Sequence, residues 1–323
     1  MTFRTTISPA LSSEVAIDHG HRIVMMGSCF SDNIGERLRQ ELFEVEVNPF
    51  GTLYNPASIV EAVNRLIDNK PVDSSSLFNH NGMWHSFSHH SSFSGTDHGE
   101  VLNNINHAID CAHHALQEAQ TLIVTFGTAY VYTLVETGDV VANCHKLPAA
   151  RFNRRSMSVA EIVELWSEAI VRLRQFNQSI KIVFTVSPIR HLADGMHGNQ
   201  LSKSTLLLAV DRLCKTFSGV AVYFPSYEIM MDDLRDYRFY ASDMTHPSDV
   251  AVDYIYKLFG QTFMSDSTRA VALECARFTR RLRHRHMSNN DNLIQAFKQD
   301  TERLRKELLQ KHPQLERALN NIQ

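Results

Sequence analysis

Short apolar runs that alternate with amphipathic helical segments constrain the fold of this chain more than any other feature. Four runs are continuous and bounded by turn residues: 22–26, 121–126, 181–186 and 220–224. Runs of this kind are typical of strands buried on both faces of a parallel sheet. A shorter candidate strand lies at 45–47, just before Asn48 and Pro49.

Helical periodicity fills the intervals between these strands. The clearest segments are 32–43, 101–116, 158–176 and 250–259. In the third segment, Ser158 and Glu161 have the spacing of a capping box. This alternation implies right-handed crossovers and predicts an α/β fold, a doubly wound parallel sheet with helices on both faces.

Three segments fall outside the alternation. Residues 77–95 are rich in His, Ser and aromatic residues and predict an irregular or hairpin insertion, while 130–141 predicts a β-hairpin. The tail at 265–323 is polar and helical, with an interruption at 288–291, and we interpret it as a packed helical hairpin. We therefore expect an α/β domain at 1–263 and a helical C-terminal extension at 264–323.

The composition argues against several classes of partner. A formal net charge of -3, from 32 basic and 35 acidic residues, gives no field that would attract nucleic acid or a membrane surface. The first residues lack the apolar core of a signal peptide, and no apolar run is long enough to cross a bilayer, so we expect a cytoplasmic protein. The five scattered cysteines include no CxxC pair, which argues against a disulfide framework or a structural zinc site.

The loop after the first strand carries two possible nucleophiles. Gly27 permits a sharp strand-to-helix turn, and Ser28 and Cys29 follow where the N-terminus of the next helix lowers a nucleophile's pKa. The alternative is a turn glycine, a helix N-cap at Ser31 or Asp32, and a buried cysteine.

The loop after the last strand carries a candidate base. Asp243 and His246 precede Pro247 and the last helix of the α/β domain. With this spacing the carboxylate can accept from one imidazole nitrogen while the other nitrogen faces a nucleophile. The alternative is a helix-capping aspartate beside a surface histidine. In doubly wound sheets, ligands bind at the carboxyl ends of the strands, where both loops are expected.

These two loops, with a collinear set of further motifs, resemble the GSCFA family, a branch of the SGNH or GDSL-type hydrolases. The resemblance covers about 20–260 and includes Gly27-Ser28-Cys29-Phe30, 48–56, Phe126-Gly127-Thr128, 143–146, 187–191, 236–240 and Asp243-x-x-His246-Pro247. It implies a flavodoxin-like, SGNH-hydrolase-like sheet of about five parallel strands and serine-esterase-like chemistry.

The resemblance also implies roles for individual residues. In the SGNH group the first motif is Gly-Asp-Ser, so an ungapped match places Cys29 at the nucleophile and Ser28 at the aspartate. Ser28 fits the chemistry usual in that group but needs a one-residue shift, and both stay candidates. Gly51 matches the glycine whose N–H binds the oxyanion. The N–H of the nucleophile is the second donor. The third motif, Gly-x-Asn, reads Gly127-Thr128-Ala129 here, so the Thr128 hydroxyl is a candidate to replace the missing asparagine.

Other polar groups are candidates for substrate binding. The residues we assign to this group are Asn48, Asn143, His145, Arg190 and His191. Either asparagine would also replace the missing Gly-x-Asn side chain. Arg190 and Lys203 suit an anionic substrate group, because a guanidinium binds carboxylate or phosphate in a bidentate way. The alternative is that residues 187–203 tie long loops together.

The seventeen histidines suggest a metal, but none has the His-Glu-x-x-His spacing that fixes ligands on one helix face. We predict no metal and no cofactor. The single basic run, 277–286, lacks an aromatic stacking platform and predicts a solvated helix face.

The function expected from these observations is hydrolysis of an acyl ester or thioester through a covalent acyl-enzyme at a Cys/Ser-His-Asp site. The substrate would be a small acylated molecule, with an anionic group as an option. The alternatives are acyl transfer by the same residues and non-catalytic ligand binding. The tail has no sustained heptad pattern, and the sequence does not indicate the oligomeric state.

Overall fold

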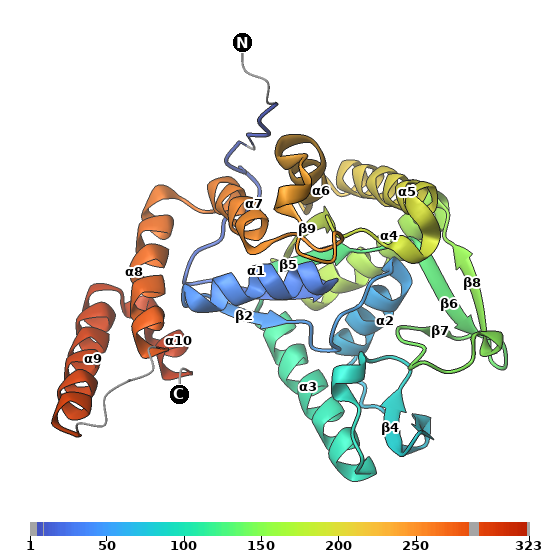
Figure 1. Cartoon of the computed structure of the whole chain (residues 1–323), viewed down its shortest axis with the longest axis horizontal. Coiled ribbons are helices and arrows are strands. Elements are labelled where there is room, and N and C mark those ends of the chain that lie inside the picture. Colours follow the sequence, from blue (N-terminus) through green and yellow to red (C-terminus); the bar gives the residue numbers. More distant parts are fainter. Residues whose placement is uncertain (1–4, 9, 284–290, 322–323) are drawn as a thin grey trace.

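The computed structural model describes residues 5–8, 10–283 and 291–321, and its centre is a five-stranded parallel sheet (Figure 1). The strand order is β10-β9-β5-β1-β2. The strands are β1 (Arg22–Gly27), β2 (Glu44–Val47), β5 (Thr121–Phe126), β9 (Lys181–Val186) and β10 (Ala221–Phe224). The α/β prediction is confirmed, because all five apolar runs are strands of this sheet.

Helices cover both faces of the sheet, as the continuous apolar strands predict. One face packs against α2 (Pro56–Ile67), α3 (His98–Glu118), α4 (Val159–Phe176) and α5 (Gly195–Thr216). The other face packs against α1 (Cys29–Gln40) and α7 (Asp249–Phe263). Alternate residues of β1 enter the two cores: Val24 faces the first and Met25 the second. The inner strands β1, β5 and β9 are therefore buried on both sides, whereas the edge strand β2 is only partly buried.

The predicted capping box at the start of α4 is present. The Ser158 side chain accepts from the Glu161 N–H, and the Glu161 carboxylate accepts from the Ser158 N–H. On the buried side of α4, Trp166 packs edge-on against Phe126 and Phe184 from two central strands. The helix is thus fixed at its end by hydrogen bonds and along its length by the core.

Two small sheets branch from the domain. The 77–95 insertion contains the antiparallel hairpin of β3 (Leu77–His80) and β4 (Met83–Ser86). The hairpin predicted at 130–141 is formed by β6 (Tyr130–Leu134) and β7 (Val140–Val141). A third strand, β8 (Phe152–Ser156), pairs with β6, and the sequence analysis did not identify it.

Between the last strand and α7 the chain makes short turns. α6 (Ser226–Glu228) continues into a π-helical segment (Ile229–Leu234), and a loop then leads to Asp243 and His246.

The C-terminal helices form a third, small core beside the sheet (Figure 1). They are α8 (Asp266–Leu282), α9 (Asp291–Lys311) and α10 (Glu316–Asn320). Leu42, which follows α1, packs with Phe278, Leu308 and Leu315 in this core. The interruption expected at 288–291 lies almost entirely outside the described residues.

Candidate active site at the carboxyl ends of the strands

Three neighbouring strands end together and bring their following loops to one place. Gly27 of β1 lies opposite Thr125 of β5, and Thr125 lies opposite Thr185 of β9. The β1 loop carries Cys29, the β5 loop Gly127, and the β9 loop His191. This is the edge of an open α/β sheet where ligands bind.

The β1–α1 turn requires a glycine. Gly27 has φ 143°, and a Cβ there would lie 2.2 Å from the Thr125 carbonyl oxygen. The Ser28 N–H donates to that carbonyl at 3.2 Å, and the Ser28 hydroxyl accepts from the Phe30 N–H as the N-cap of α1. Ser28 is 1% exposed, whereas Cys29, the first residue of the helix, is partly exposed. The N-cap expected at Ser31 or Asp32 is therefore at Ser28.

The Cys29 thiol is protonated at neutral pH. Burial raises its pKa to about 11, and the nearby Asp32 carboxylate acts in the same direction. The backbone N–H groups of Cys29 and Phe30 and the Lys203 ammonium oppose this rise. A protonated thiol reacts slowly, so nucleophilic attack by Cys29 requires a base.

Asn48 lies beside the β1–α1 turn. Its side-chain oxygen accepts from the Gly27 N–H at 2.9 Å, and its amide donates to Asp32 at 2.7 Å. The residue is 8% exposed. Asn48 therefore supports the β1–α1 turn, and its role in substrate binding stays a prediction.

Gly51 also differs from the expectation. Its N–H, predicted to bind an oxyanion, donates to the Asn48 carbonyl at 2.7 Å. The glycine has φ 71°, and a Cβ would lie 2.3 Å from the Cβ of His90. Gly51 is therefore needed for a turn packed against His90, and its donor is already used in this conformation.

The Thr128 side chain is also engaged. Its hydroxyl lies 3.1 Å from the Ser202 hydroxyl and accepts from the Tyr130 N–H at 3.2 Å. Ser202 also accepts from the Ala129 N–H, so the β5 loop is attached to α5. Thr128 has one hydroxyl proton, which either Ser202 or a ligand can accept.

Asp243 and His246 interact as the sequence predicts for a base and its carboxylate. Asp243 Oδ2 lies 2.5 Å from His246 Nδ1, and Asp243 Oδ1 accepts from the N–H groups of Thr245 and His246, both at 2.9 Å. These hydrogen bonds hold the pKa of Asp243 well below its usual range. With Nδ1 facing the carboxylate, Nε2 is the nitrogen left to exchange a proton.

The loop that carries this pair is attached to the β9 loop. The Arg190 N–H donates to the Thr245 carbonyl at 3.3 Å. Side chains of both members of the pair are about half exposed, 48% for Asp243 and 46% for His246. Among the described residues no hydrogen bond joins His246 to Cys29. A hydrogen bond between them would have to form when a substrate closes the site.

His191 is a second histidine at this edge. Burial lowers its pKa to about 4, and the charges of Lys203 and His246 add to the effect. The backbone N–H of His191 donates to the side-chain oxygen of Asn199, and the His191 ring packs edge-on against Tyr54. The ring nitrogen Nε2 has no partner among the described residues. His191 is therefore neutral at pH 7 and borders the space beside Gly127.

Arg190 lies in an aromatic setting. Its guanidinium lies 4.9 Å from the ring centroid of Tyr240 and 5.7 Å from that of Tyr237. Its guanidinium also lies 3.9 Å from the Met231 sulfur. No described carboxylate forms an ion pair with Arg190, so its charge is available to an anion.

Asn143 and His145 lie with the β3–β4 insertion. The Asn143 side chain accepts from the His145 N–H, and His145 Nε2 lies 2.8 Å from the Ser86 carbonyl. The His145 ring also packs against those of Phe78 and His85. These contacts hold the insertion together, and the assignment of Asn143 and His145 to substrate binding stays a prediction.

Lys203 was expected to bind an anionic substrate group, and its position in the structure differs from that expectation. It is fully buried, and its ammonium donates to the carbonyls of Gly127 at 2.6 Å and Ser187 at 2.8 Å. It ties the β5 and β9 loops together and does not face solvent. The interpretation that residues 187–203 tie loops together therefore holds for Lys203, and the anion-binding interpretation does not.

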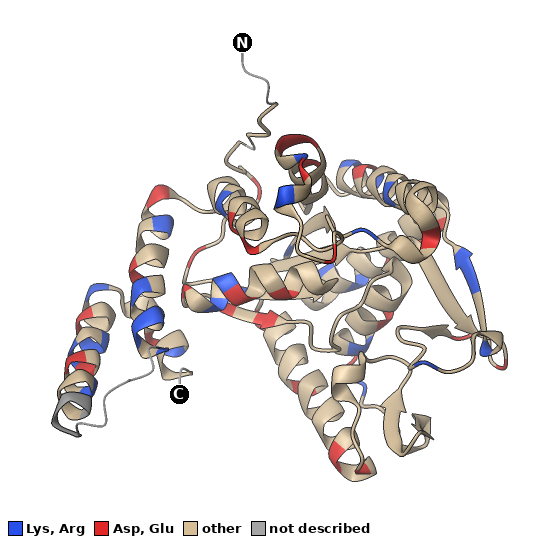
Figure 2. Ribbon diagram, in the orientation of Figure 1, with Lys and Arg blue, Asp and Glu red and all other residues tan. Residues whose placement is uncertain are grey.

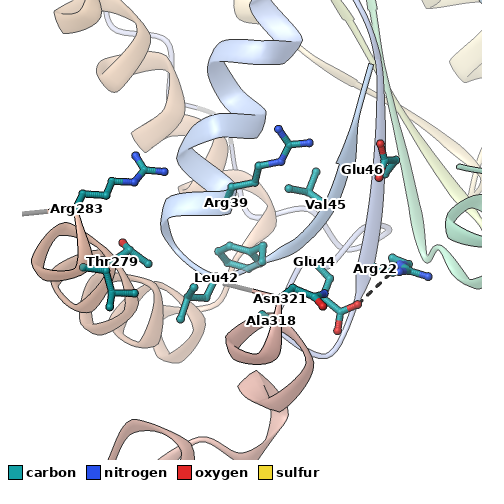
Figure 3. Close-up of a pocket in the computed structure, with 12 residues that line it drawn as sticks. Arg22, Arg39, Leu42, Glu44, Val45, Glu46, Thr279, Arg283, Ala318 and Asn321 are labelled. Carbon is teal, nitrogen blue, oxygen red and sulfur yellow. Dashed lines mark ion pairs between the residues drawn. The ribbon is translucent and has the colours of Figure 1, made fainter. Parts of the chain in front are cut away.

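A large cavity lies at the other end of the sheet (Figure 3). Its volume is about 520 Å³, and it is lined by the first residues of β1 and β2, the end of α1 and the C-terminal helices. Arg22 and Glu44 form an ion pair within it, and Arg39 and Arg283 extend along its wall. Among the described residues that line this cavity, no nucleophile lies beside a histidine, so we do not take it as the candidate active site.

Charged residues of both signs alternate along α8 and α9 (Figure 2). Within the basic run, Arg281 pairs with Asp300 and Arg283 with Glu36. Residues 284–286 of that run lie outside the described residues. In the part of the chain that the structure describes, no three His, Cys, Asp or Glu side chains are grouped to hold a metal ion, and no helix is long and apolar enough to span a membrane.

The fold and this edge define an α/β protein whose candidate nucleophile and Asp–His pair lie on loops at the carboxyl ends of a parallel sheet. The family model of the GSCFA family matches residues 22–259, and the chain belongs to that family. No curated protein matches the chain.

Proposed function

We propose that this protein hydrolyses acyl esters or thioesters through a covalent acyl-enzyme on Cys29. The observation that carries the proposal is the Asp243–His246 pair, held by three hydrogen bonds on a loop at the same sheet edge as the β1–α1 turn. Membership of the GSCFA family, which resembles the SGNH hydrolases, supports this chemistry.

Cys29 is a better nucleophile candidate than Ser28. The Ser28 hydroxyl is buried and serves as the N-cap of α1. Cys29 is partly exposed, and N–H groups of the first helical turn favour its thiolate. Its raised pKa indicates a thiol that loses its proton only as it attacks, which gives His246 its role.

The reaction has two balanced halves. Cys29 Sγ attacks the acyl carbonyl carbon, and its proton passes to His246 Nε2. The carbon–oxygen or carbon–sulfur bond then breaks, and His246 returns the proton to the leaving group. In the second half water attacks the thioester, loses a proton to His246, and releases the acid and the Cys29 thiol. Asp243 holds the imidazole through Nδ1 in both halves.

The developing oxyanion needs donors. The Cys29 N–H is a first-turn helix donor, and the hydrogen bonds of the described residues do not use it. Thr128 supplies a hydroxyl when its proton turns away from Ser202. Gly51 would contribute only if substrate binding releases its N–H from Asn48.

The surroundings favour a substrate with both an anionic and an apolar group. Arg190 carries an unpaired charge beside the loop of the Asp–His pair. Leu192, Tyr237 and Met244 are 48%, 61% and 50% exposed, and each lies within three residues of, or in contact with, a candidate residue. A short acyl chain with a terminal carboxylate would use both features.

Labelling tests the nucleophile. Wild type, Cys29→Ser, Ser28→Ala and His246→Ala are treated near neutral pH with iodoacetamide or a fluorophosphonate and weighed intact. We expect iodoacetamide to modify Cys29 in wild type and Ser28→Ala, and more slowly in His246→Ala. Modification of Ser28 by the fluorophosphonate would mean that Ser28, and not Cys29, is the nucleophile that carries the acyl group. No reaction with either reagent would reject the covalent mechanism.

A matched ester pair tests the substrate class. p-Nitrophenyl valerate and the mono-p-nitrophenyl ester of glutaric acid have equal chain length and differ in the terminal carboxylate. We expect the anionic ester to have the higher kcat/KM in wild type and to lose that preference in Arg190→Met. Equal selectivity in both proteins would remove Arg190 from the proposal.

One observation favours a second candidate, a ligand-binding protein without turnover. The family resemblance predicts an oxyanion site from Gly51 and a Gly-x-Asn side chain, yet the Gly51 N–H is already paired and Ala129 stands at the asparagine position. Loss of one oxyanion donor costs about 3 kcal/mol in transition-state stabilisation. Saturable binding of the glutarate ester with no nitrophenol released would select this candidate.

A further inference from the structure

The three-stranded sheet of β6, β7 and β8 continues the β5 loop beyond the candidate active site, and we call residues 130–156 the β6–β8 arm. Its first strand begins three residues after Gly127, and β8 returns antiparallel to β6 with Arg154 opposite Tyr132. In Figure 1 the arm lies beside α5, the helix that follows the β9 loop. The arm and the β9 loop thus both extend from the sheet edge where the candidate site lies.

One ion pair joins the β6–β8 arm to the β9 loop. The Arg154 guanidinium donates to the carboxylate of Asp194, which lies four residues after Arg190. The side chain of Asp194 is 3% exposed and that of Arg154 is 34% exposed. The guanidinium also lies over the ring of Tyr130, 3.9 Å from its centroid. Arg154 is therefore held by both a ring and a carboxylate, and the carboxylate is almost completely buried.

Asp194 stands at a position where an aspartate usually has another partner. It is the N-cap residue of α5, and an N-cap carboxylate ordinarily accepts from the N–H groups of the first helical turn. The Asp194 side chain makes no such hydrogen bond to α5. The carboxylate therefore serves the contact between the β9 loop and the arm instead of the end of its own helix.

The β5 and β9 loops are joined at two levels. Lys203 joins them at their start, through a backbone carbonyl of each loop. The Arg154–Asp194 pair joins their continuations again, where the β9 loop meets α5. Arg190 lies between these two contacts, and Leu192 beside it is 48% exposed, so apolar packing adds little there. The ion pair is therefore needed to keep the exposed part of the β9 loop in place.

Loss of Arg154 would leave the Asp194 carboxylate without its cation in an almost completely buried position. Because burial of an unpaired charge is unfavourable, we expect the loop to move until the carboxylate reaches water. Arg190 would move with it. Its guanidinium, which lies 4.9 Å from the ring centroid of Tyr240, would then lose the fixed position from which it can bind an anion.

We propose that Arg154 is a positioning residue, which through Asp194 holds the β9 loop in the conformation that presents Arg190 to an anionic substrate and thereby determines the preference for such a substrate. The inference rests on the proposed role of Arg190 in substrate binding. Arg154 itself does not touch the substrate or the reacting atoms. Its removal should change the mobility of the loop and the binding of the anionic group, and not the attack by Cys29.

Three variants and a control separate the ion pair from the rest of the arm. Arg154→Met removes the charge and keeps an apolar stem against the Tyr130 ring, while Asp194→Asn removes the opposite charge at constant shape. Arg154→Asp combined with Asp194→Arg exchanges the two charges. Arg155→Met is the matched control, because Arg155 is the next residue of β8 and pairs with Glu161 of α4. Circular dichroism and thermal unfolding identify the variants that keep the fold.

Hydrogen exchange measured by mass spectrometry reports the mobility of the loop in peptides that cover 187–198. We expect exchange to be about tenfold faster in Arg154→Met and in Asp194→Asn than in wild type, between the effects expected of an exposed and of a buried pair. The charge exchange should restore slow exchange at least in part, and Arg155→Met should match wild type. Unchanged exchange in whichever of the two single variants folds would overturn the proposal.

Calorimetric titration with the 4-nitroanilides of glutaric and valeric acid measures the preference without turnover, because an anilide is a poorer acyl donor than an ester. We expect wild type to bind the glutaric anilide about tenfold more tightly, as a charge-assisted hydrogen bond allows. Arg154→Met and Asp194→Asn should lose most of this preference and bind the valeric anilide as wild type does.

The titration also distinguishes failure of this inference from failure of the proposed function. A folded single variant that keeps the wild-type preference for the glutaric anilide would overturn the role of Arg154 and leave the proposed substrate class standing. Equal binding of the two anilides by wild type, or binding of neither, would reject the anionic substrate class and with it the role of Arg154.

Discussion

Two groups of histidines lie on loops of this protein, and they differ in what surrounds them. His246 at the sheet edge is half exposed and hydrogen-bonded to a carboxylate. His89 and His145 in and beside the β3–β4 insertion are buried among aromatic rings, and burial lowers the pKa of each. Histidine content therefore does not locate chemistry in this chain. A histidine that is hydrogen-bonded to a carboxylate at the edge of the parallel sheet is a better indicator of the active site.

The strongest test of this contrast removes one histidine from each group. His246→Ala should lower kcat on the glutarate ester about 10³-fold, because a general base contributes about 10²–10⁴. His145→Ala should lower the melting temperature and leave kcat nearly unchanged, since its contacts are with Ser86, Phe78 and His85. Initial rates give kcat, and thermal unfolding gives the melting temperature, of both variants. If His145→Ala loses activity while it stays folded, the distinction between the two groups of histidines is wrong.

Asp243→Asn tests the carboxylate that is hydrogen-bonded to His246 at the sheet edge. We expect kcat to fall about 10²-fold, because an amide no longer favours the tautomer with a proton on Nδ1. Since hydrogen bonds hold the pKa of Asp243 well below its usual range, this carboxylate stays charged through the acidic range. A pH–rate profile of the wild type should therefore show no acidic limb caused by Asp243. Full activity in Asp243→Asn would remove the carboxylate from the mechanism.

His191 provides a further test of this contrast. It lies at the sheet edge, as His246 does, but it is buried beside an aromatic ring, as His89 and His145 are. Its pKa of about 4 and its contacts with Asn199 and Tyr54 indicate a residue that shapes the site. His191→Gln should lower kcat less than about tenfold, below the contribution expected of a general base. A loss equal to that of His246→Ala would make His191, with its unpartnered Nε2, the base that serves Cys29.

The sheet was predictable because its inner strands β1, β5 and β9 are buried on both faces and form continuous apolar runs. Five apolar runs and the capping box at Ser158 and Glu161 correspond to observed elements. The bounds of α5 were not predictable from apolar periodicity, because buried Asn199, Ser202 and Lys203 replace apolar residues on its inner side. β8 was missed for a related reason: it reads FNRRS and is mostly exposed, so neither alternation nor a buried run marks it.

The candidate site was predictable only in part. Motif spacing indicated Cys29, which comes just after β1, and the Asp243–His246 pair, which comes just before α7. Asn48, Gly51 and His145 were assigned to ligand contacts, but the Asn48 side chain, the Gly51 N–H and His145 Nε2 are bonded to other parts of the chain. Such pairing depends on turns with positive φ, at 48° for Asn48 and for His145, that no spacing rule reports.

The smallest expected effect concerns the pH dependence of stability. Burial lowers the pKa of His89 to about 3, against 6.5 for an unperturbed histidine. Above pH 6.5 both folded and unfolded states hold a neutral imidazole. Between pH 6.5 and 3 only the unfolded state takes the proton, so the free energy of unfolding falls as the pH falls, by about 1.4 kcal/mol per pH unit.

His89→Gln should reduce that slope by about one proton while keeping an acceptor or donor for the Ser86 hydroxyl. Urea unfolding at pH 4.5, 5.5, 6.5 and 7.5 measures it, with His114→Gln, an exposed site on α3, as the control. We expect the variant to be less stable than wild type at pH 7.5 and closer to it at pH 4.5. Parallel curves for the two proteins would mean that His89 takes up its proton equally in the folded and unfolded states, which would contradict this prediction.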